Sequence, residues 1–157
     1  MIFQCTMTLT RTTSENLNFQ QLVNQLNAFL AEMNGSDHAF YNQFNGIAAL
    51  HHVVVACDND NKPVGCGGLK QVDNESVEIK RMYVDPVQRG RGVGGAVLAE
   101  LEAWTLELGF RACVLETSVK LPAAVHLYTK HGYVRTPNYG QYVDMPDSVC
   151  FRKNLIP

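Results

Sequence analysis

The residues with the clearest chemical character lie in segment 83–95, which reads YVDPVQRGRGVGG. An apolar run ends at Asp85 and Pro86, and Arg89 and Arg91 then alternate with glycines. Glycines leave backbone N–H groups uncovered, and the N–H groups in the first turn of a following helix have no partner within that helix. Together with the helix dipole and two guanidinium charges, these groups predict a binding site for an anion such as a diphosphate.

The overall composition indicates that this anion belongs to a small molecule. The chain has 157 residues and a net charge of −2, so the two arginines form a local positive charge in a chain that is slightly acidic as a whole. We therefore expect neither a nucleic acid nor a membrane as partner. With 46% hydrophobic residues the chain can bury a core, and we expect a single domain over residues 1–157. Because no basic segment followed by a long apolar run is found, we expect a cytoplasmic protein.

The cysteines and histidines predict neither a metal site nor a cysteine nucleophile. The five cysteines are scattered, mostly in apolar surroundings, at Cys5, Cys57, Cys66, Cys113 and Cys150. Their odd number and irregular spacing are typical of reduced, buried thiols. His51 and His52 are adjacent and point to opposite faces of a strand, while His126 and His131 are five residues apart on a predicted helix. Neither pair is placed to hold one ion, so we expect no metal.

The N-terminal half predicts helices followed by an antiparallel meander. A strand is expected over residues 3–10, and Thr13 or Ser14 is the expected N-cap of a helix that ends at Gly35. Apolar residues recur on one face of this helix, at Leu22, Leu26, Phe29, Leu30 and Met33. A second, short helix is expected over residues 37–45. Turn residues then separate three strands, over residues 52–57, 64–71 and 77–84.

The C-terminal half predicts a crossover and two further strands. A helix runs from Val93 to Gly109, and a strand follows over residues 112–117, parallel to the strand that precedes the helix. Pro122 begins another helix, and the last strands are expected over residues 133–135 and 149–153. The fold class is therefore α+β, with a mixed, mostly antiparallel sheet of six to seven strands flanked by about four helices.

The glycines also satisfy a dinucleotide-binding pattern. Gly90, Gly92 and Gly95 spell G-x-G-x-x-G, and Glu116 follows at about the 20-residue distance expected of the acidic residue that binds ribose. A dinucleotide fold, however, places this loop after the first strand of a repeated βαβ array, whereas an antiparallel meander comes first here. A nicotinamide-dependent oxidoreductase stays the less favoured alternative.

Three motifs taken together resemble one known family. Residues 89–94 satisfy the pattern R/Q-x-x-G-x-G, the strand EIKRMYV precedes them at 78–84, and LYTKHGY follows at 127–133. In this order and spacing they resemble the GNAT family of N-acetyltransferases, and the resemblance covers nearly the whole chain. It implies a single GNAT-like domain and an acetyl-CoA-dependent acyltransferase. A second possibility is a non-catalytic acyl-CoA-binding module.

The resemblance implies acetyl-CoA as cosubstrate and assigns residues to it. Its diphosphate is expected on the glycine loop, at Arg89, Gly90, Arg91, Gly92, Val93, Gly94 and Gly95. Its pantetheine arm is expected beside the strand, at Met82, Tyr83 and Val84, although these side chains also suit an ordinary core. The strand must diverge from its parallel neighbour to admit the arm, so we expect irregular backbone at Lys80-Arg81.

Acetyl transfer to an amine requires a neutral amine and a proton for the departing thiolate. Glu78 is the candidate base, directly or through water, and the alternative is a carboxylate paired with Lys80. The resemblance implies that Tyr128 is the general acid, and the alternative is a packing tyrosine. Leu121 departs from the family, whose members often carry asparagine or glutamine there.

The acceptor amine is not identified by the sequence. Two segments are candidate walls of its site: residues 137–142, with Tyr139 and Tyr142, and the second helix, with Phe40, Tyr41, Phe44 and Asn45. Asp144 or Asp147 is a candidate to attract a cation. The expected partner is a small-molecule or peptide amine, and a homodimer is common among such relatives.

Overall fold

Four helices and seven strands are found in the described part of the chain, residues 6–44 and 46–156 of the computed structural model. The strands are β1 (Thr8–Thr12), β2 (His52–Cys57), β3 (Pro63–Gln71), β4 (Ser76–Val84), β5 (Ala112–Ser118), β6 (Val134–Thr136) and β7 (Ser148–Asn154). The helices are α1 (Leu17–Asn34), α2 (His38–Asn42), α3 (Val93–Glu107) and α4 (Pro122–Lys130). Three single turns of 3-10 helix are η1 (Gly35–Asp37), η2 (Pro86–Gln88) and η3 (Gly140–Tyr142).

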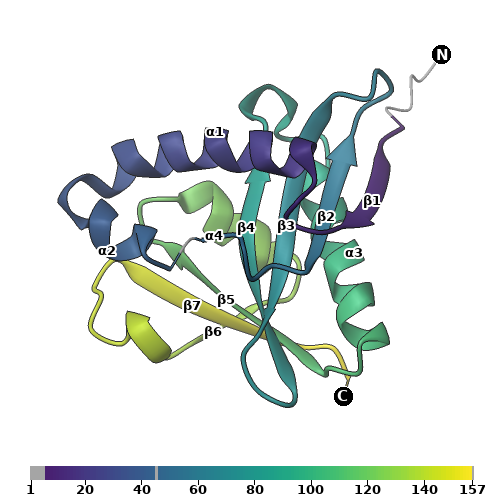
Figure 1. Ribbon diagram of the computed structural model, residues 1–157. Helices are drawn as coiled ribbons and strands as arrows, with labels where there is room; N and C mark the ends of the chain where they lie inside the picture. Colours follow the sequence, from purple (N-terminus) through teal and green to yellow (C-terminus); the bar gives the residue numbers. More distant parts are fainter. Residues whose placement is uncertain (1–5, 45, 157) are drawn as a thin grey trace. The chain divides into compact units, whose positions relative to one another are not determined.

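The strands are hydrogen-bonded in the order β1-β2-β3-β4-β5-β7-β6 (Figure 1). β4 and β5 are parallel. The pairs β1–β2, β2–β3, β5–β7 and β6–β7 are antiparallel. The predicted α+β class, with its mixed and mostly antiparallel sheet, is confirmed.

The chain divides into two compact units that alternate along the sequence. The first comprises Met1–Lys70 and Lys80–Leu101, and the second comprises Gln71–Ile79 and Glu102–Pro157. Strand β4 and helix α3 contribute residues to both units. The expectation of a single domain over residues 1–157 stays a prediction.

In the first unit, helix α1 lies across β2 and β3 (Figure 1). Its buried residues Phe19, Leu22 and Leu26 pack in one core cluster with Val53 and Val55 of β2. This is the apolar face that the helical spacing predicts. The start of the helix differs from the prediction, which placed the N-cap at position 13 or 14. The N-cap is residue 16, an asparagine whose side chain accepts a hydrogen bond from the backbone N–H of Phe19.

Small residues of β3 bring helix α3 close to the strands of the first unit. A Cβ atom built on Gly65 would lie 2.6 Å from Cγ1 of Val93, and one built on Gly67 would lie 2.8 Å from Cδ1 of Leu101. Both contacts are too short for any side chain larger than glycine's. The two glycines therefore set the depth of α3 and fix the position of the segment that leads into it.

The second unit holds β5, β6, β7, helix α4 and the beginning of β4. Helix α4 packs through the ring of Tyr128, which lies 5.8 Å from the ring of Tyr133 and 6.3 Å from that of Phe151. The end of α3 contributes Glu102, which accepts hydrogen bonds from the Tyr133 hydroxyl and from the ammonium group of Lys153.

Some predicted boundaries shift. The first strand is residues 8–12 rather than 3–10, and residues 3–5 lie outside the described residues. The second helix is residues 38–42 rather than 37–45: Asp37 belongs to the 3-10 turn η1, the helix ends at Asn42, and Asn45 is not described. Segment 137–142, a candidate wall of the acceptor site, contains η3. No helix among the described residues has the length and apolar character that crossing a membrane requires.

Candidate active site

The glycine-rich segment presents a run of unpaired backbone amides at the start of α3. Among the described residues, no hydrogen bond is found for the backbone N–H groups of residues 90–95. The first paired amide in this region is that of Ala96, which donates to the carbonyl of Gly92 at 3.0 Å. Unpaired amides at a helix N-terminus can bind phosphate oxygens.

Two glycines of this segment adopt backbone conformations that L-residues rarely take. Gly90 has φ 79° and Gly92 has φ 82°. A Cβ atom built on either would meet no protein atom within 4 Å, so the space above both residues is open. The glycines are therefore required by backbone conformation and not by crowding, and the open space fits a ligand that approaches the amides.

Arg89 and Arg91 flank these amides at the surface. The Nε of Arg89 donates to the carbonyl of Val84 at 3.3 Å, and its guanidinium lies 5.9 Å from the ring of Phe29 on α1. Nη1 of Arg91 lies 3.4 Å from Oε1 of Gln88. Neither arginine is paired with a carboxylate within the described ranges, so both charges are available to an anion.

The second half of β4 carries the residues expected beside the pantetheine arm. The Met82 side chain faces β3, where its Sδ would lie 2.5 Å from a Cβ built on Gly67. The Tyr83 ring belongs to the α1 core cluster, and its hydroxyl lies 3.4 Å from Oε1 of Gln25. The Tyr83 side chain thus serves the core, and that of the half-buried Met82 packs toward β3.

Strand β4 is irregular where the sequence predicts it. Its parallel pairing with β5 runs from Ser76 to Glu78, which pairs with Val114. Arg81 then has φ 58°, a left-handed conformation that is unusual for a residue with a side chain. The expected break at Lys80-Arg81 is confirmed.

Glu78 is buried and held by a tyrosine that the sequence does not link to it. Only 5% of Glu78 is exposed. The hydroxyl of Tyr139 donates a hydrogen bond of 2.6 Å to its Oε2. Burial raises the pKa of Tyr139 above its usual value, and the charge of Glu78 raises it further. The tyrosine therefore stays protonated and donates to the carboxylate.

A single asparagine fixes the loop that carries Tyr139. The Nδ2 of Asn138 donates to the carbonyls of Tyr142, Met145 and Ser148, at 3.1, 3.3 and 2.9 Å. The rings of Tyr139 and Tyr142 pack edge to face with centroids 5.8 Å apart. Residues 137–142 are thus a braced segment over Glu78 and not a loose surface loop.

Tyr128 is buried, with 6% of its surface exposed. Burial raises the pKa of its hydroxyl, and the charge of Glu116 adds to the shift. The ring of Tyr128 packs on Phe151, so it lies on the face of the sheet to which Phe151 points. Cys150 is next to Phe151 on β7 and therefore points to the other face, and so does Glu116, which is paired with Cys150. Glu78 shares the face of Glu116, since its partner Val114 lies two residues before Glu116 on β5. The two candidate catalytic side chains therefore belong to opposite faces of the second unit's sheet.

Other residues singled out from the sequence have different surroundings. Asp147 is paired with Lys120 at 3.3 Å. Phe40 of α2 packs edge to face with Tyr41 and Phe44. Leu121 directly precedes α4 and makes no side-chain cap there.

The cysteines are poorly suited to catalysis. Cys57, Cys66, Cys113 and Cys150 are free, and Cys5 lies outside the described residues. Burial raises the pKa of the Cys66 thiol to about 12, so it stays protonated at neutral pH and is a poor nucleophile. No group of three or more histidine, cysteine and acidic side chains suited to a metal is found in residues 6–44 and 46–156.

Comparison with known families identifies the class of protein. The chain matches the model of the acetyltransferase (GNAT) family over residues 19–133, which include the glycine loop, β4 and Tyr128. The protein belongs to this family, and its resemblance to the GNAT N-acetyltransferases is confirmed.

Among curated proteins, the chain is similar to the IAA acetyltransferase of Azospirillum brasilense. The two are 28% identical over 137 residues, which cover 86% of this chain and 89% of that protein. An uncharacterized N-acetyltransferase of Schizosaccharomyces pombe is 32% identical over 104 residues, which cover 66% of this chain and 63% of that protein.

Solved structures share the fold. A Klebsiella pneumoniae protein assigned as an acyl-CoA N-acyltransferase has a TM-score of 0.82 at 27% identity, over 98% of this chain and 100% of that chain. A GNAT acetyltransferase of Elizabethkingia anophelis, solved with acetyl-CoA bound, has a TM-score of 0.69 at 20% identity, over 95% and 98% of the two chains.

Proposed function

We propose that this protein transfers the acetyl group of acetyl-CoA to a primary amine of a small molecule or a protein. The amine attacks directly while both substrates are bound. The observation that carries the proposal is the run of unpaired amides at residues 90–95, flanked by two arginines that have no carboxylate partner among the described residues, in a chain of the acetyltransferase (GNAT) family. Acetyl-CoA contributes an acetyl group activated as a thioester.

The residues of the first unit suit the binding of this cosubstrate. The amides of residues 90–95 and the guanidiniums of Arg89 and Arg91 would hold its diphosphate. The open space above Gly90 and Gly92 supports this assignment. Backbone groups of Met82, Tyr83 and Val84 would bind the pantetheine arm.

Glu78 would take a proton from the amine. An alkyl amine has a pKa near that of lysine, about 10.4, and must lose a proton before it can attack. Glu78 is buried and oriented by the Tyr139 hydroxyl, which engages Oε2. The carboxylate would accept the proton directly or through a water molecule.

Tyr128 would return a proton to the departing thiolate. Burial raises the pKa of Tyr128, so the hydroxyl carries its proton across the physiological range.

The test is an acetyl-transfer assay with acetyl-CoA and a panel of amines: amino acids, polyamines, aminoglycosides and peptides with free N-termini. We expect thiol release together with an acetylated product for at least one amine. Glu78→Gln should lower kcat while calorimetry shows unchanged acetyl-CoA affinity. Tight binding of acetyl-CoA without turnover on any amine would overturn the proposal in favour of a binding module. Tighter binding of NAD than of CoA would favour the oxidoreductase.

A further inference from the structure

Arg89 is the better restrained of the two arginines in the glycine loop. Its backbone N–H donates to the carbonyl of Pro86 at 3.4 Å. Its Nε donates to the carbonyl of Val84 at 3.3 Å, and its guanidinium lies over the ring of Phe29 on α1, 5.9 Å from the ring centroid. The two Nη nitrogens have no hydrogen-bond partner within the described residues. The side chain is therefore held along its length, while the donors at its end are available to an anion.

Arg91 lacks comparable support. Its hydrogen bond among the described residues is the contact of 3.4 Å between its Nη1 and Oε1 of Gln88. That contact occupies a terminal nitrogen, and the partner is another long side chain. Binding an anion therefore costs more side-chain freedom at Arg91 than at Arg89.

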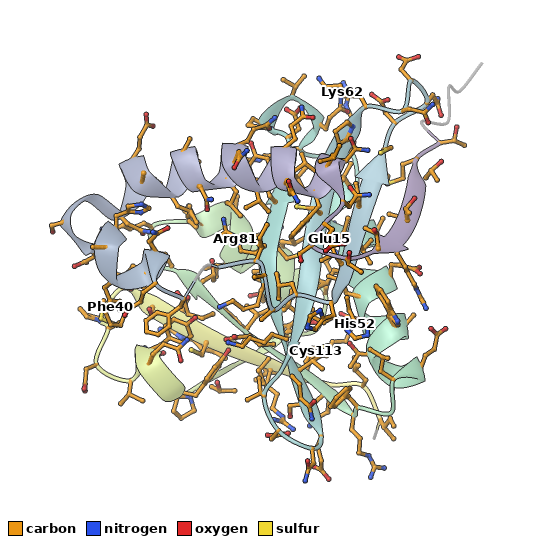
Figure 2. All side chains as sticks on the ribbon, viewed as in Figure 1. Glu15, Phe40, His52, Lys62, Arg81 and Cys113 are labelled. Atoms are coloured by element: carbon orange, nitrogen blue, oxygen red, sulfur yellow. The ribbon has the colours of Figure 1, made fainter. Side chains whose placement is uncertain are left out.

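The ring of Phe29 is itself fixed, because α1 is tied to β4 at two earlier positions of the helix. Oε1 of Gln25 lies 3.4 Å from the hydroxyl of Tyr83. Oδ1 of Asn27 accepts a hydrogen bond from Nη2 of Arg81, which is buried. Figure 2 shows the Arg81 side chain between β4 and α1, inside the first unit. Phe29 is half-buried against the core cluster of this unit, so its ring has a defined place beside the end of β4.

We propose that Phe29 is a positioning residue for the cosubstrate, because its ring holds the guanidinium of Arg89 where the two Nη nitrogens bind the diphosphate. This inference rests on the proposed binding of acetyl-CoA at residues 89–95. All the residues that it uses belong to the first unit. An aromatic face attracts a guanidinium placed over it. A side chain that is ordered in advance loses less conformational entropy when the ligand binds. Phe29 therefore raises the affinity for the diphosphate through Arg89.

Two alternatives give Phe29 no such role. If the ring only packs against the core, its removal affects stability but not the affinity for the cosubstrate. If Arg89 must leave the ring to reach the anion, the contact opposes binding, and removal of the ring lowers the dissociation constant. The direction in which the affinity changes therefore separates the proposal from both alternatives.

The first experiment measures the dissociation constant of CoA by calorimetry, which needs no turnover. Phe29→Leu removes the ring and keeps an apolar side chain. We expect Kd to rise about 2- to 10-fold, the effect of leaving one long side chain to be ordered on binding. In the acetyl-transfer assay, KM for acetyl-CoA should rise and kcat should stay unchanged. An unchanged or lower Kd would overturn the inference and leave acetyl transfer intact. If the unmodified protein binds no CoA, the proposed function itself fails.

Two variants on the same helix are the controls. Leu30 follows Phe29 and packs against the same core cluster, but it carries no ring. Leu30→Ala should lower the melting temperature and leave Kd unchanged. Phe29→Tyr keeps the aromatic face and should retain the affinity of the unmodified protein. A raised Kd in either control would show that the packing of α1, and not the ring, sets the affinity. Phe29→Met, which also lacks a ring, replaces Phe29→Leu if that variant does not fold.

A double-mutant cycle tests whether Phe29 acts through Arg89. In an Arg89→Gln background, Phe29→Leu should leave Kd unchanged, because no guanidinium remains to be held. In an Arg91→Gln background, the same substitution should keep its full effect. Equal effects in the two backgrounds would contradict the inference.

Dephospho-CoA identifies the phosphate that Arg89 binds. This ligand keeps the diphosphate and lacks the 3′-phosphate of CoA. Phe29→Leu should raise Kd by the same factor for both ligands. If the effect disappears with dephospho-CoA, Arg89 binds the 3′-phosphate instead, and the inference is wrong.

Discussion

The hydroxyl of Tyr139 donates a hydrogen bond of 2.6 Å to Oε2 of Glu78, across 61 positions of the sequence. Tyr139 sits in a loop that Asn138 braces through three carbonyls, so its hydroxyl is held in place by the backbone around it. Glu78 is buried, so its orientation depends on such contacts. Tyr139 is therefore a positioning residue for the proposed base.

Tyr139→Phe tests that role. The variant removes one hydrogen bond to a charged group, which is worth about 1.5–3 kcal/mol, so we expect kcat to fall about 10- to 100-fold. The KM for acetyl-CoA should stay the same, because the glycine loop is untouched. Steady-state kinetics with acetyl-CoA and the best acceptor measure both values.

Tyr133→Phe is the matched control. Tyr133 is also a buried tyrosine of the second unit, and its hydroxyl also donates to a carboxylate, Oε2 of Glu102 at 3.0 Å. Tyr133→Phe should lower the free energy of unfolding about as much as Tyr139→Phe does, without lowering kcat. Equal effects of the two substitutions on kcat would show that Tyr139 matters only for folding.

Gly92→Ala tests the glycine loop. Gly92 has φ 82°, and a Cβ atom there points into open space above the unpaired amides. We expect stability to fall by about 1–2 kcal/mol from backbone strain, and the KM for acetyl-CoA to rise at least tenfold because the methyl group occupies the ligand's space.

Gly109→Ala separates these two effects. Gly109 has φ 92° and no atom within 4 Å of a built Cβ, so the same strain arises after α3 ends. Its stability loss should match that of Gly92→Ala, whereas the KM for acetyl-CoA should not change. An unchanged KM in Gly92→Ala would contradict the placement of the diphosphate.

The spacing of apolar residues and the positions of turn residues predicted most of the fold, because apolar spacing indicates which face of a helix or strand is buried. The bounds of β2, residues 52–57, agree with the prediction, and the apolar face of α1 packs as its spacing indicates. The irregular backbone at Arg81 was also predicted, from the need of β4 to diverge. The predicted N-cap of α1 was wrong. By residue type Thr13 and Ser14 are as good caps as the asparagine found at position 16, and only the turn that precedes Leu17 decides which residue caps the helix.

The sequence did not predict the environment of the candidate base. Tyr139 and Glu78 are brought together by the path of a loop that has no periodic pattern, and the one signal was the polar, aromatic composition of segment 137–142. The burial of Arg81 was missed because arginines are usually exposed. Such contacts depend on tertiary packing, which neither propensity nor periodicity encodes.

Tyr128→Phe tests the proposed acid. The change keeps the ring contacts with Tyr133 and Phe151, so the fold should be preserved. We expect kcat to fall about 10²- to 10⁴-fold if the hydroxyl protonates the leaving thiolate. A decrease of less than twofold would leave Tyr128 with a packing role only. Circular dichroism checks that the variant is folded.

Alkaline pH should destabilise the protein through its buried tyrosines. Burial is the largest cause that raises the pKa of four tyrosines in the second unit, Tyr128, Tyr133, Tyr139 and Tyr142. In the unfolded chain they ionise near pH 10. Their contribution to stability is therefore complete below about pH 10 and is lost as the pH rises above it, by up to about 1.4 kcal/mol per pH unit for each tyrosine. Denaturant unfolding from pH 8 to 11 measures this slope, and Tyr133→Phe should reduce it by one tyrosine's share. Ionisation of all six tyrosines near pH 10, seen in the ultraviolet absorbance while circular dichroism stays native, would contradict the burial of these hydroxyls.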